Sequence, residues 1–167
     1  CECKNLIYKE DLQKNLNCCP KCGAHHKLTC TERFEIFFDN KEFDLISTPL
    51  PKDDPINFVD KKKYTDRLKS ARKVTKQNDA VSISTGKLNN IQVTVGAQDF
   101  RFIGGSFGAA SGEAFIHGVQ HAIENKTPFI FFSCSGGQRM MESAIALMQM
   151  SRTVLAVNEL KKHNLPY

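Results

Sequence analysis

The sequence predicts an α/β fold whose core occupies residues 78–167. Strand-like and helix-like segments follow one another there in a β-α-β-α order, each with the hydrophobic periodicity of its type. Two glycine turns, 102–108 and 133–139, each open a predicted helix after a predicted strand. The chain of 167 residues is 41% hydrophobic and 25% charged, as globular proteins are, and can hold one core with a small appendage.

The first thirty residues carry a cysteine cluster. Six of the seven cysteines lie there, and the seventh, Cys134, lies in the second glycine turn. Cys19 and Cys22 form a metal knuckle because two thiolates spaced by two residues can bind one tetrahedral ion. We therefore predict a zinc ribbon over 1–30, with a disulfide framework as the rival. The ribbon is too small for an apolar core and should lose its fold without metal.

The other half of the ligand set is incomplete in sequence. Cys1 and Cys3 are one residue short of a second C-x-x-C pair. Either both bind the ion, or Cys3 binds together with a cysteine upstream of residue 1. We favour the upstream cysteine, because Cys3 fits as the last residue of such a pair and we expect a fragment cut at both ends. His25 and His26 are weaker substitutes.

Residues 31–77 are predicted to connect the ribbon to the core. A short helix is expected over 31–38, with Thr31 as its N-cap. Three prolines make 47–58 irregular, and a basic helix is expected over 60–76.

The basic helix carries much of the net charge of +5. The plain interpretation is a solvated helix face; the functional ones are phosphates of a nucleotide-like cofactor, or nucleic acid. Tyr64 is the one aromatic residue among these charges, which weakens the nucleic-acid interpretation. No apolar run approaches the roughly 20 residues that would span a bilayer, so no transmembrane segment is predicted.

The core elements are expected from local patterns alone. Two alternating segments flank an Asn89-Asn90 turn, which predicts a hairpin. A helix over 111–125 has one apolar face. In order, the expected elements are strands 80–86 and 91–95, helix 111–125, a buried strand over 129–134 and a helix from about 139.

The second glycine turn is the strongest candidate for chemistry. Gly136 and Gly137 let the backbone bend and present bare N–H groups at a helix N-terminus, where they bind negative charge. In a dry cleft they would stabilise an oxyanion. The alternative is a tight turn that glycine merely permits. Cys134 and Ser135 are possible nucleophiles, although packing beside the turn is favoured, and no Ser/His/Asp triad is evident.

Taken together, these motifs resemble the β-subunit family of bacterial acetyl-CoA carboxylase carboxyltransferases over nearly the whole chain. The resemblance implies part of a ClpP/crotonase-like spiral core behind a four-cysteine zinc ribbon, with a family core that continues beyond Tyr167. Gln138 stands where most members have alanine. The motifs are Cys19-Pro-Lys-Cys22, Lys63-Tyr-Thr-Asp-Arg-Leu68, Gly104-Gly-Ser106, Ser133-Cys-Ser-Gly-Gly-Gln-Arg-Met140 and Leu147-Met-Gln-Met150.

The reaction that the resemblance implies moves a carboxyl group from carboxybiotin, borne by a carrier protein, to acetyl-CoA. The product, malonyl-CoA, commits carbon to fatty acid synthesis. Gly136 and Gly137 would hold one of two oxyanions, with the thioester oxygen favoured over the biotin ureido oxygen, and the α subunit would hold the other. Gly104 and Gly105 would shape the CoA channel. Arg139 would contact a cofactor phosphate or cap the interface with a partner.

The implied partners are the α subunit in an α2β2 assembly, the biotin carboxyl carrier protein and biotin carboxylase, all in the cytoplasm. Nucleotide and ATP binding are further implications. The rival enzyme is another crotonase-like acyl-CoA enzyme, such as a propionyl-CoA carboxylase or malonate decarboxylase subunit, against which the ribbon argues. The rival from another class is an RNA-binding zinc-ribbon module.

Overall fold

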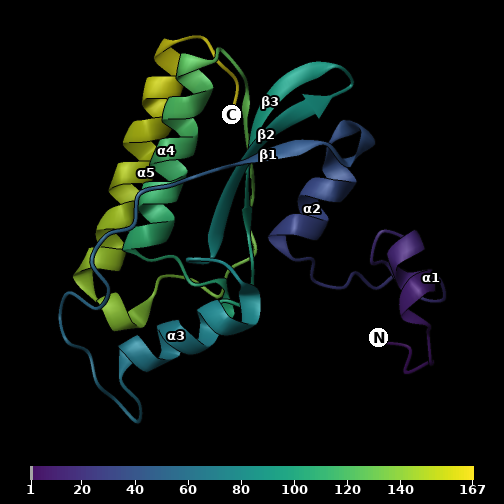
Figure 1. Ribbon diagram of the computed structural model, residues 1–167, viewed down its shortest axis with the longest axis horizontal. Helices are drawn as coiled ribbons and strands as arrows, with labels where there is room; N and C mark the ends of the chain where they lie inside the picture. Colours follow the sequence, from purple (N-terminus) through teal and green to yellow (C-terminus); the bar gives the residue numbers. More distant parts are fainter. Residues whose placement is uncertain (1) are drawn as a thin grey trace.

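A four-stranded sheet forms the centre of the computed structural model, which describes residues 2–167 (Figure 1). Its strands are β1 (Phe43–Ile46), β2 (Val81–Leu88), β3 (Ile91–Gln98) and β4 (Phe129–Phe132), in that spatial order. The first two pairings are antiparallel, whereas β3 and β4 are parallel. The predicted α/β class is therefore confirmed, with one strand, β1, that the sequence patterns did not indicate.

The predicted hairpin is confirmed as β2 and β3. Asn89 and Asn90 both have positive φ, 50° and 63°, as a two-residue turn that matches the sheet twist requires. The turn fixes the register, which pairs Leu88 with Ile91 and Val81 with Gln98. Both strands run further than their alternating segments, so β3 delivers Gln98 to the edge where the first glycine turn begins.

Helices cover both faces of the sheet (Figure 1). Helices α4 (Ala109–Glu124) and α5 (Ala144–Lys162) pack on one face, where Phe115 and Val119 meet Ile83 and Phe129. Helix α2 (Cys30–Phe37) covers the other face. There Cys30, Phe34 and Phe38 meet the side chains of Val93, Val95 and Ala97. Alternation along the strands thus supplies two separate apolar layers.

The expected connector also contributes to the core. Helix α3 (Tyr64–Thr75) closes one end of the sheet, and its Tyr64 and Leu68 pack with Phe102 and Met141. Helix α2 begins earlier than expected, because Thr29 rather than Thr31 is its N-cap: Thr29 and Glu32 form a reciprocal capping box.

The last helix also starts later than expected. A short 3-10 turn, η3 (Met140–Glu142), follows the second glycine turn, and Ser143 has a positive φ of 51° that no α-helix accommodates. Helix α5 therefore begins at Ala144, and Gly136 and Gly137 do not lie at its N-terminus. Two further 3-10 turns are η1 (Asp39–Lys41) and η2 (Ile103–Gly105).

The N-terminal segment forms a small unit beside α2 (Figure 1). It contains one short helix, α1 (Lys9–Lys14), and a bridge between Cys18 and His25. Among residues 2–29 only Cys19 is buried, so this unit lacks an apolar core of its own, as predicted. Across residues 2–167, no helix is long and apolar enough to cross a membrane.

Candidate functional site

The two glycine turns lie against each other where β3 and β4 end. The N–H of Gly136 donates to the Gly104 carbonyl at 2.9 Å. The N–H of Phe107 donates to the Gly137 carbonyl at 2.9 Å, and that of Arg139 returns to the Phe107 carbonyl at 2.9 Å. These bonds make a short parallel bridge between the turns, so their relative position is set by backbone geometry.

Gln98 ties both turns to the sheet. It is buried at the end of β3, where its Nε2 donates to the Gly105 carbonyl at 2.7 Å. Its Oε1 accepts the N–H of Cys134 at 3.3 Å. Gly105 has φ of +65°, and a Cβ there would overlap the Cys134 carbonyl oxygen. Gly104 has the same φ but open space around it. The close approach of the turns therefore requires glycine at position 105 in particular.

The N–H groups of the second turn are not bare, contrary to the sequence expectation. That of Gly136 is bound to Gly104, and that of Gly137 donates to the Ser135 hydroxyl at 3.0 Å. Ser135, Gly136 and Gly137 are all exposed. Gly137 thus has an exposed donor whose present partner is a rotatable hydroxyl, whereas the donor of Gly136 is used to join the turns.

A largely apolar hollow of about 580 Å³ opens beside Gly137. Phe107, Phe115 and Phe131 form part of its wall, and Val154 and Val157 of α5 form another. Polar groups on its lining come from the second turn, from Gln98, and from the C-terminal segment, which contributes Thr153, Asn158, Lys161 and Tyr167. A largely apolar cavity with a limited number of polar groups suits a small ligand that has an apolar part.

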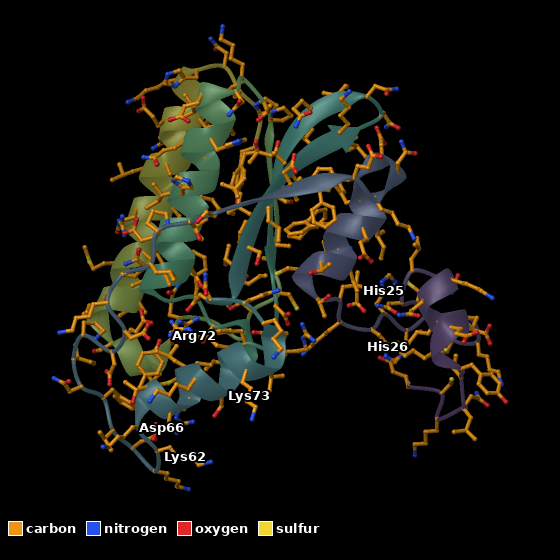
Figure 2. The ribbon with its side chains drawn as sticks, in the orientation of Figure 1. His25, His26, Lys62, Asp66, Arg72 and Lys73 are labelled. Atoms are coloured by element: carbon orange, nitrogen blue, oxygen red, sulfur yellow. The ribbon has the colours of Figure 1, made fainter. Side chains whose placement is uncertain are left out.

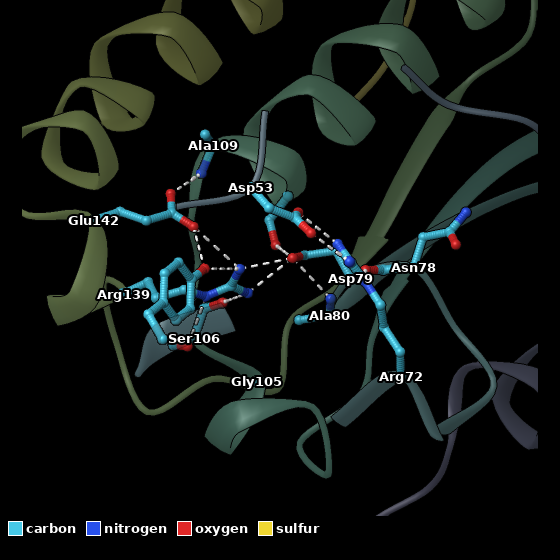
Figure 3. Close-up of polar contacts among 12 residues, drawn as sticks. Asp53, Arg72, Asn78, Asp79, Ala80, Gly105, Ser106, Ala109, Arg139 and Glu142 are labelled. Atoms are coloured by element: carbon cyan, nitrogen blue, oxygen red, sulfur yellow. Dashed lines mark hydrogen bonds and ion pairs between the residues drawn. The ribbon is translucent and has the colours of Figure 1, made fainter. Parts of the chain in front are cut away.

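Arg139 lies inside the protein, with 1% of its surface exposed. Figure 3 shows its guanidinium between the carboxylates of Asp79 and Glu142. Its two terminal nitrogens donate to both carboxylate oxygens of Asp79, at 2.6 and 2.8 Å, and one also reaches Glu142 at 3.3 Å. The same guanidinium donates to the Ser106 carbonyl at 2.6 Å and to its hydroxyl at 3.1 Å. Arg139 therefore attaches the second turn to the first.

Burial alone would lower the pKa of Arg139, but Asp79 raises it above its ordinary value, so the side chain stays charged. Glu142 is buried too, and accepts bonds from the Tyr64 hydroxyl and from the N–H of Ala109 at the start of α4, each at 2.5 Å. In this arrangement Arg139 is buried and faces protein carboxylates, whereas the sequence analysis expected it to contact a phosphate or a partner.

Three residues of this site escaped the sequence analysis: Gln98, Asp79 and Glu142. Polar residues at strand ends are a signal that points to sites in α/β sheets. Gln98, the last residue of β3, and Asp79, just before β2, carry that signal. Glu142 carries none, because it lay within the expected helix.

The cysteine cluster of the ribbon is confirmed for its described members. The Sγ atoms of Cys3, Cys19 and Cys22 lie within 4.8 Å of one another, and those of Cys3 and Cys19 are 3.9 Å apart. Ligands about 2.3 Å from a tetrahedral zinc would be roughly 3.8 Å apart, so the three fit that ion. Hydrogen bonds from Asn5 lower the pKa of Cys3 to about 6, which favours the thiolate that metals bind.

A tetrahedral zinc site takes one ligand more than these three cysteines. Cys1 lies outside the described residues. His25 and His26 do not join the cluster in the described part of the chain. His25 instead lies beside Cys18, with its Nδ1 3.6 Å from that Sγ.

The α/β sheet, the two glycine turns in contact and the cluster of three cysteines together indicate the class of the protein: a carboxyltransferase-like domain with a zinc ribbon. The comparisons agree. The chain belongs to the carboxyl transferase domain family, whose model matches residues 27–167, and residues 2–22 match the acetyl-CoA carboxylase zinc finger domain. Both the resemblance and the expected crotonase-type fold class are confirmed. Neither family description mentions ATP or another nucleotide, so those two expectations gain no support.

Comparisons with individual proteins agree with this family assignment. The chain is 52% identical over 165 residues to the acetyl-coenzyme A carboxylase carboxyl transferase subunit beta of Pelagibacter ubique, covering 99% of this chain and 53% of that relative. The chain thus spans about half the length of this relative. A transcarboxylase 12S structure with methylmalonyl-coenzyme A bound matches with a TM-score of 0.58 and 25% identity, over 78% of this chain and 23% of the other.

A Pseudomonas malonate decarboxylase hetero-dimer matches with the same TM-score of 0.58 at 18% identity, over 81% of this chain and 49% of its own. This likeness concerns the fold alone.

Proposed function

We propose that this chain acts in a carboxyltransferase that moves a carboxyl group from carboxybiotin, on a carrier protein, to the methyl carbon of acetyl-CoA. The observation that carries the proposal is the 52% identity, over 99% of the chain, to a protein named for that reaction. The CoA thioester bound to the similar transcarboxylase supports the substrate class. The matched zinc finger favours this enzyme over other acyl-CoA carboxylases and decarboxylases.

The chemical demand is for stabilised negative charge. Removing a proton from the acetyl methyl group places charge on the thioester oxygen, and a preorganised donor lowers the energy of that enolate. We assign this donor to the exposed N–H of Gly137, which exchanges the Ser135 hydroxyl for the thioester oxygen. Gly136 contributes by holding the turn against Gly104. Released biotin can itself accept the methyl proton.

We assign binding of the substrate to the hollow and the first turn. The acetyl group would enter the apolar hollow beside Gly137, and half-exposed Gly104, with open space around it, would line the path of the CoA arm. Buried Gly105 lets the first turn approach Cys134. Arg139 acts behind both turns as a positioning residue, because its contacts are to Ser106 and to buried carboxylates.

The ribbon would hold a zinc ion through Cys3, Cys19 and Cys22, with the fourth ligand from Cys1 or a cysteine upstream of it. We infer that the zinc has a structural role. The ribbon lacks an apolar core that could hold its fold, and zinc sites made only of thiolates have no open position for a substrate. An all-thiolate metal site also fits a reducing compartment, and we propose the cytoplasm. The proposed partners are an α subunit in an α2β2 assembly, the biotin carboxyl carrier protein and biotin carboxylase.

The test uses the full-length protein, purified with and without its α partner and loaded with zinc. Malonyl-CoA-dependent carboxylation of free biotin, the reverse reaction, should appear only when both subunits are present. Gly137→Val should abolish most of it, because φ of +122° at this position excludes a β-branched residue. Gln120→Val, at an exposed position of α4, is the matched control. Unchanged activity in Gly137→Val would refute the assigned donor.

RNA binding by the ribbon and the basic helix is a second candidate. The lysines of that helix favour it, but its support is reduced because Tyr64 is buried and cannot stack on a base. Arg67 and Arg72 are also paired, with Asp60 and Asp53 at 2.6 Å. RNA affinity that falls steeply with salt and disappears when the ribbon is deleted would establish it; undetectable or salt-independent binding would remove it.

A further inference from the structure

A second hollow lies on the far side of the second glycine turn. It is a groove of about 220 Å³ between three parts of the fold: the segment joining the ribbon to α2, the first turns of α2, and the ends of β3 and β4. Figure 2 places His25 and His26 in that joining segment, beside α2. Lys27, Arg33 and Ser133 also line the groove.

The groove carries positive charge from Lys27 and Arg33. None of its lining residues is an aspartate or glutamate. Lys27 and Arg33 make no ion pair within residues 2–167; each instead lies over an aromatic ring, Lys27 at 2.9 Å from the Phe100 centroid and Arg33 at 5.0 Å from that of Phe132. The rings fix the two cations by packing and leave their charges available to an anion.

The position of the groove relative to the first hollow suggests what the anion is. Parallel strands β3 and β4 both end here, and ligands of open α/β sheets bind outside the carboxyl ends of such strands. Gln98 and Ser133 line both hollows, so the same turn separates the proposed acyl site from the basic groove. A long ligand with an acyl group at one end and phosphates at the other can occupy both.

We propose that the basic groove binds the phosphate groups of the CoA part of the thioester substrate. Arg33 supplies a planar pair of donors that matches phosphate, Lys27 supplies a point charge, and the exposed Ser133 hydroxyl supplies a neutral donor. The segment that follows the ribbon thereby takes part in substrate recognition. This inference rests on the proposed function, whose substrate it positions.

The experiment replaces charge while keeping the packing on the rings. Arg33→Met and Lys27→Met are made in the full-length, zinc-loaded complex with the α partner, and exposed Lys87→Met on β2 is the control. Each variant is assayed with acetyl-CoA and with acetyl-pantetheine, which lacks the nucleotide. Losing one charged phosphate contact should raise KM for acetyl-CoA about tenfold, leave kcat unchanged, and leave KM for acetyl-pantetheine unchanged.

A binding measurement separates this inference from the proposed function. Calorimetry with CoA and with 3′,5′-ADP needs no turnover, and both ligands should bind each variant about tenfold more weakly than the parent. If carboxyl transfer is absent but this loss of affinity is seen, the proposed reaction is wrong and the assignment of the groove to CoA phosphates is supported. Equal CoA affinity in parent and variants would overturn the groove even in an active enzyme. Loss of affinity for single-stranded RNA alone, with CoA binding intact, would overturn it as well.

Discussion

Replacing Arg139 with methionine should destabilise the fold more than any surface substitution. The change removes the cation that forms ion pairs with two buried carboxylates, Asp79 and Glu142, each of which is 4% exposed. Asp79 would keep only the Ser111 hydroxyl at 2.6 Å and the Ala80 N–H at 2.8 Å. Leaving a buried charge unpaired costs about 3–5 kcal/mol of unfolding free energy.

That magnitude is large against the whole stability of a domain, which is about 5–15 kcal/mol. At about 2–4 °C per kcal/mol for a chain of this size, the midpoint should fall by roughly 6–20 °C. The chain has no tryptophan, so unfolding is followed in urea and on heating by far-UV circular dichroism. Arg152→Met is the matched control: Arg152 pairs with Glu113 at 2.7 Å but is 39% exposed, so its loss should cost under about 1 kcal/mol.

A second substitution tests the cause. Asp79→Asn in the Arg139→Met background removes the stranded charge and should recover part of the lost stability, with a coupling free energy above about 1 kcal/mol. If Arg139→Met costs no more than Arg152→Met, the buried carboxylates are not held by the guanidinium and the reasoning is refuted. Strict additivity of the two changes would refute it equally.

Three further outcomes follow from the fold. A chelator should expose the backbone amides of residues 2–26 to hydrogen exchange while the sheet stays protected; protection retained throughout would contradict a metal-dependent ribbon. Gly104→Ala should lower the free energy of unfolding in urea by about 1–2 kcal/mol, because alanine is strained in its left-handed backbone conformation. Gly105→Ala should lower it clearly more, because its Cβ would also meet the Cys134 carbonyl. Equal losses in the two variants would contradict that contact. Burial raises the pKa of Cys30 to about 11, so mass spectrometry should find Cys30 unalkylated in the native protein at pH 8. Because the thiol of the unfolded chain ionises first, the free energy of unfolding should fall as the pH rises from 9 towards 11. Rapid alkylation of the native protein would show that the thiol is not buried.

The sequence allowed the elements with strong local patterns to be predicted. The Asn89-Asn90 turn specified the hairpin, and the cysteine spacing specified the knuckle. Strand β1 was missed because it has only four residues and exists through its pairing with β2. The start of α5 was misplaced because an apolar pattern does not report the left-handed backbone of Ser143.

The role of Arg139 could not be predicted for a different reason. Its partner Asp79 lies 60 residues away in sequence, and no local pattern encodes a contact over that distance. The glycines beside it were identifiable, since glycine reports a backbone demand at its own position. Whether their N–H groups face a ligand or each other depends on how two distant turns meet, which only the folded chain determines.

Three sets of bonds hold the glycine turns together: the backbone bonds of Phe107 and Gly136, the two contacts of Gln98, and the guanidinium of Arg139. A turn needed only to reverse the chain would not require all three, since one glycine and one backbone bond suffice for that. The proposed stabilisation of an oxyanion would require them, because a donor contributes to catalysis only if it is already in place when the charge develops. On that proposal, the buried ion pairs around Arg139 are the support that fixes the position of the proposed Gly137 donor relative to the hollow.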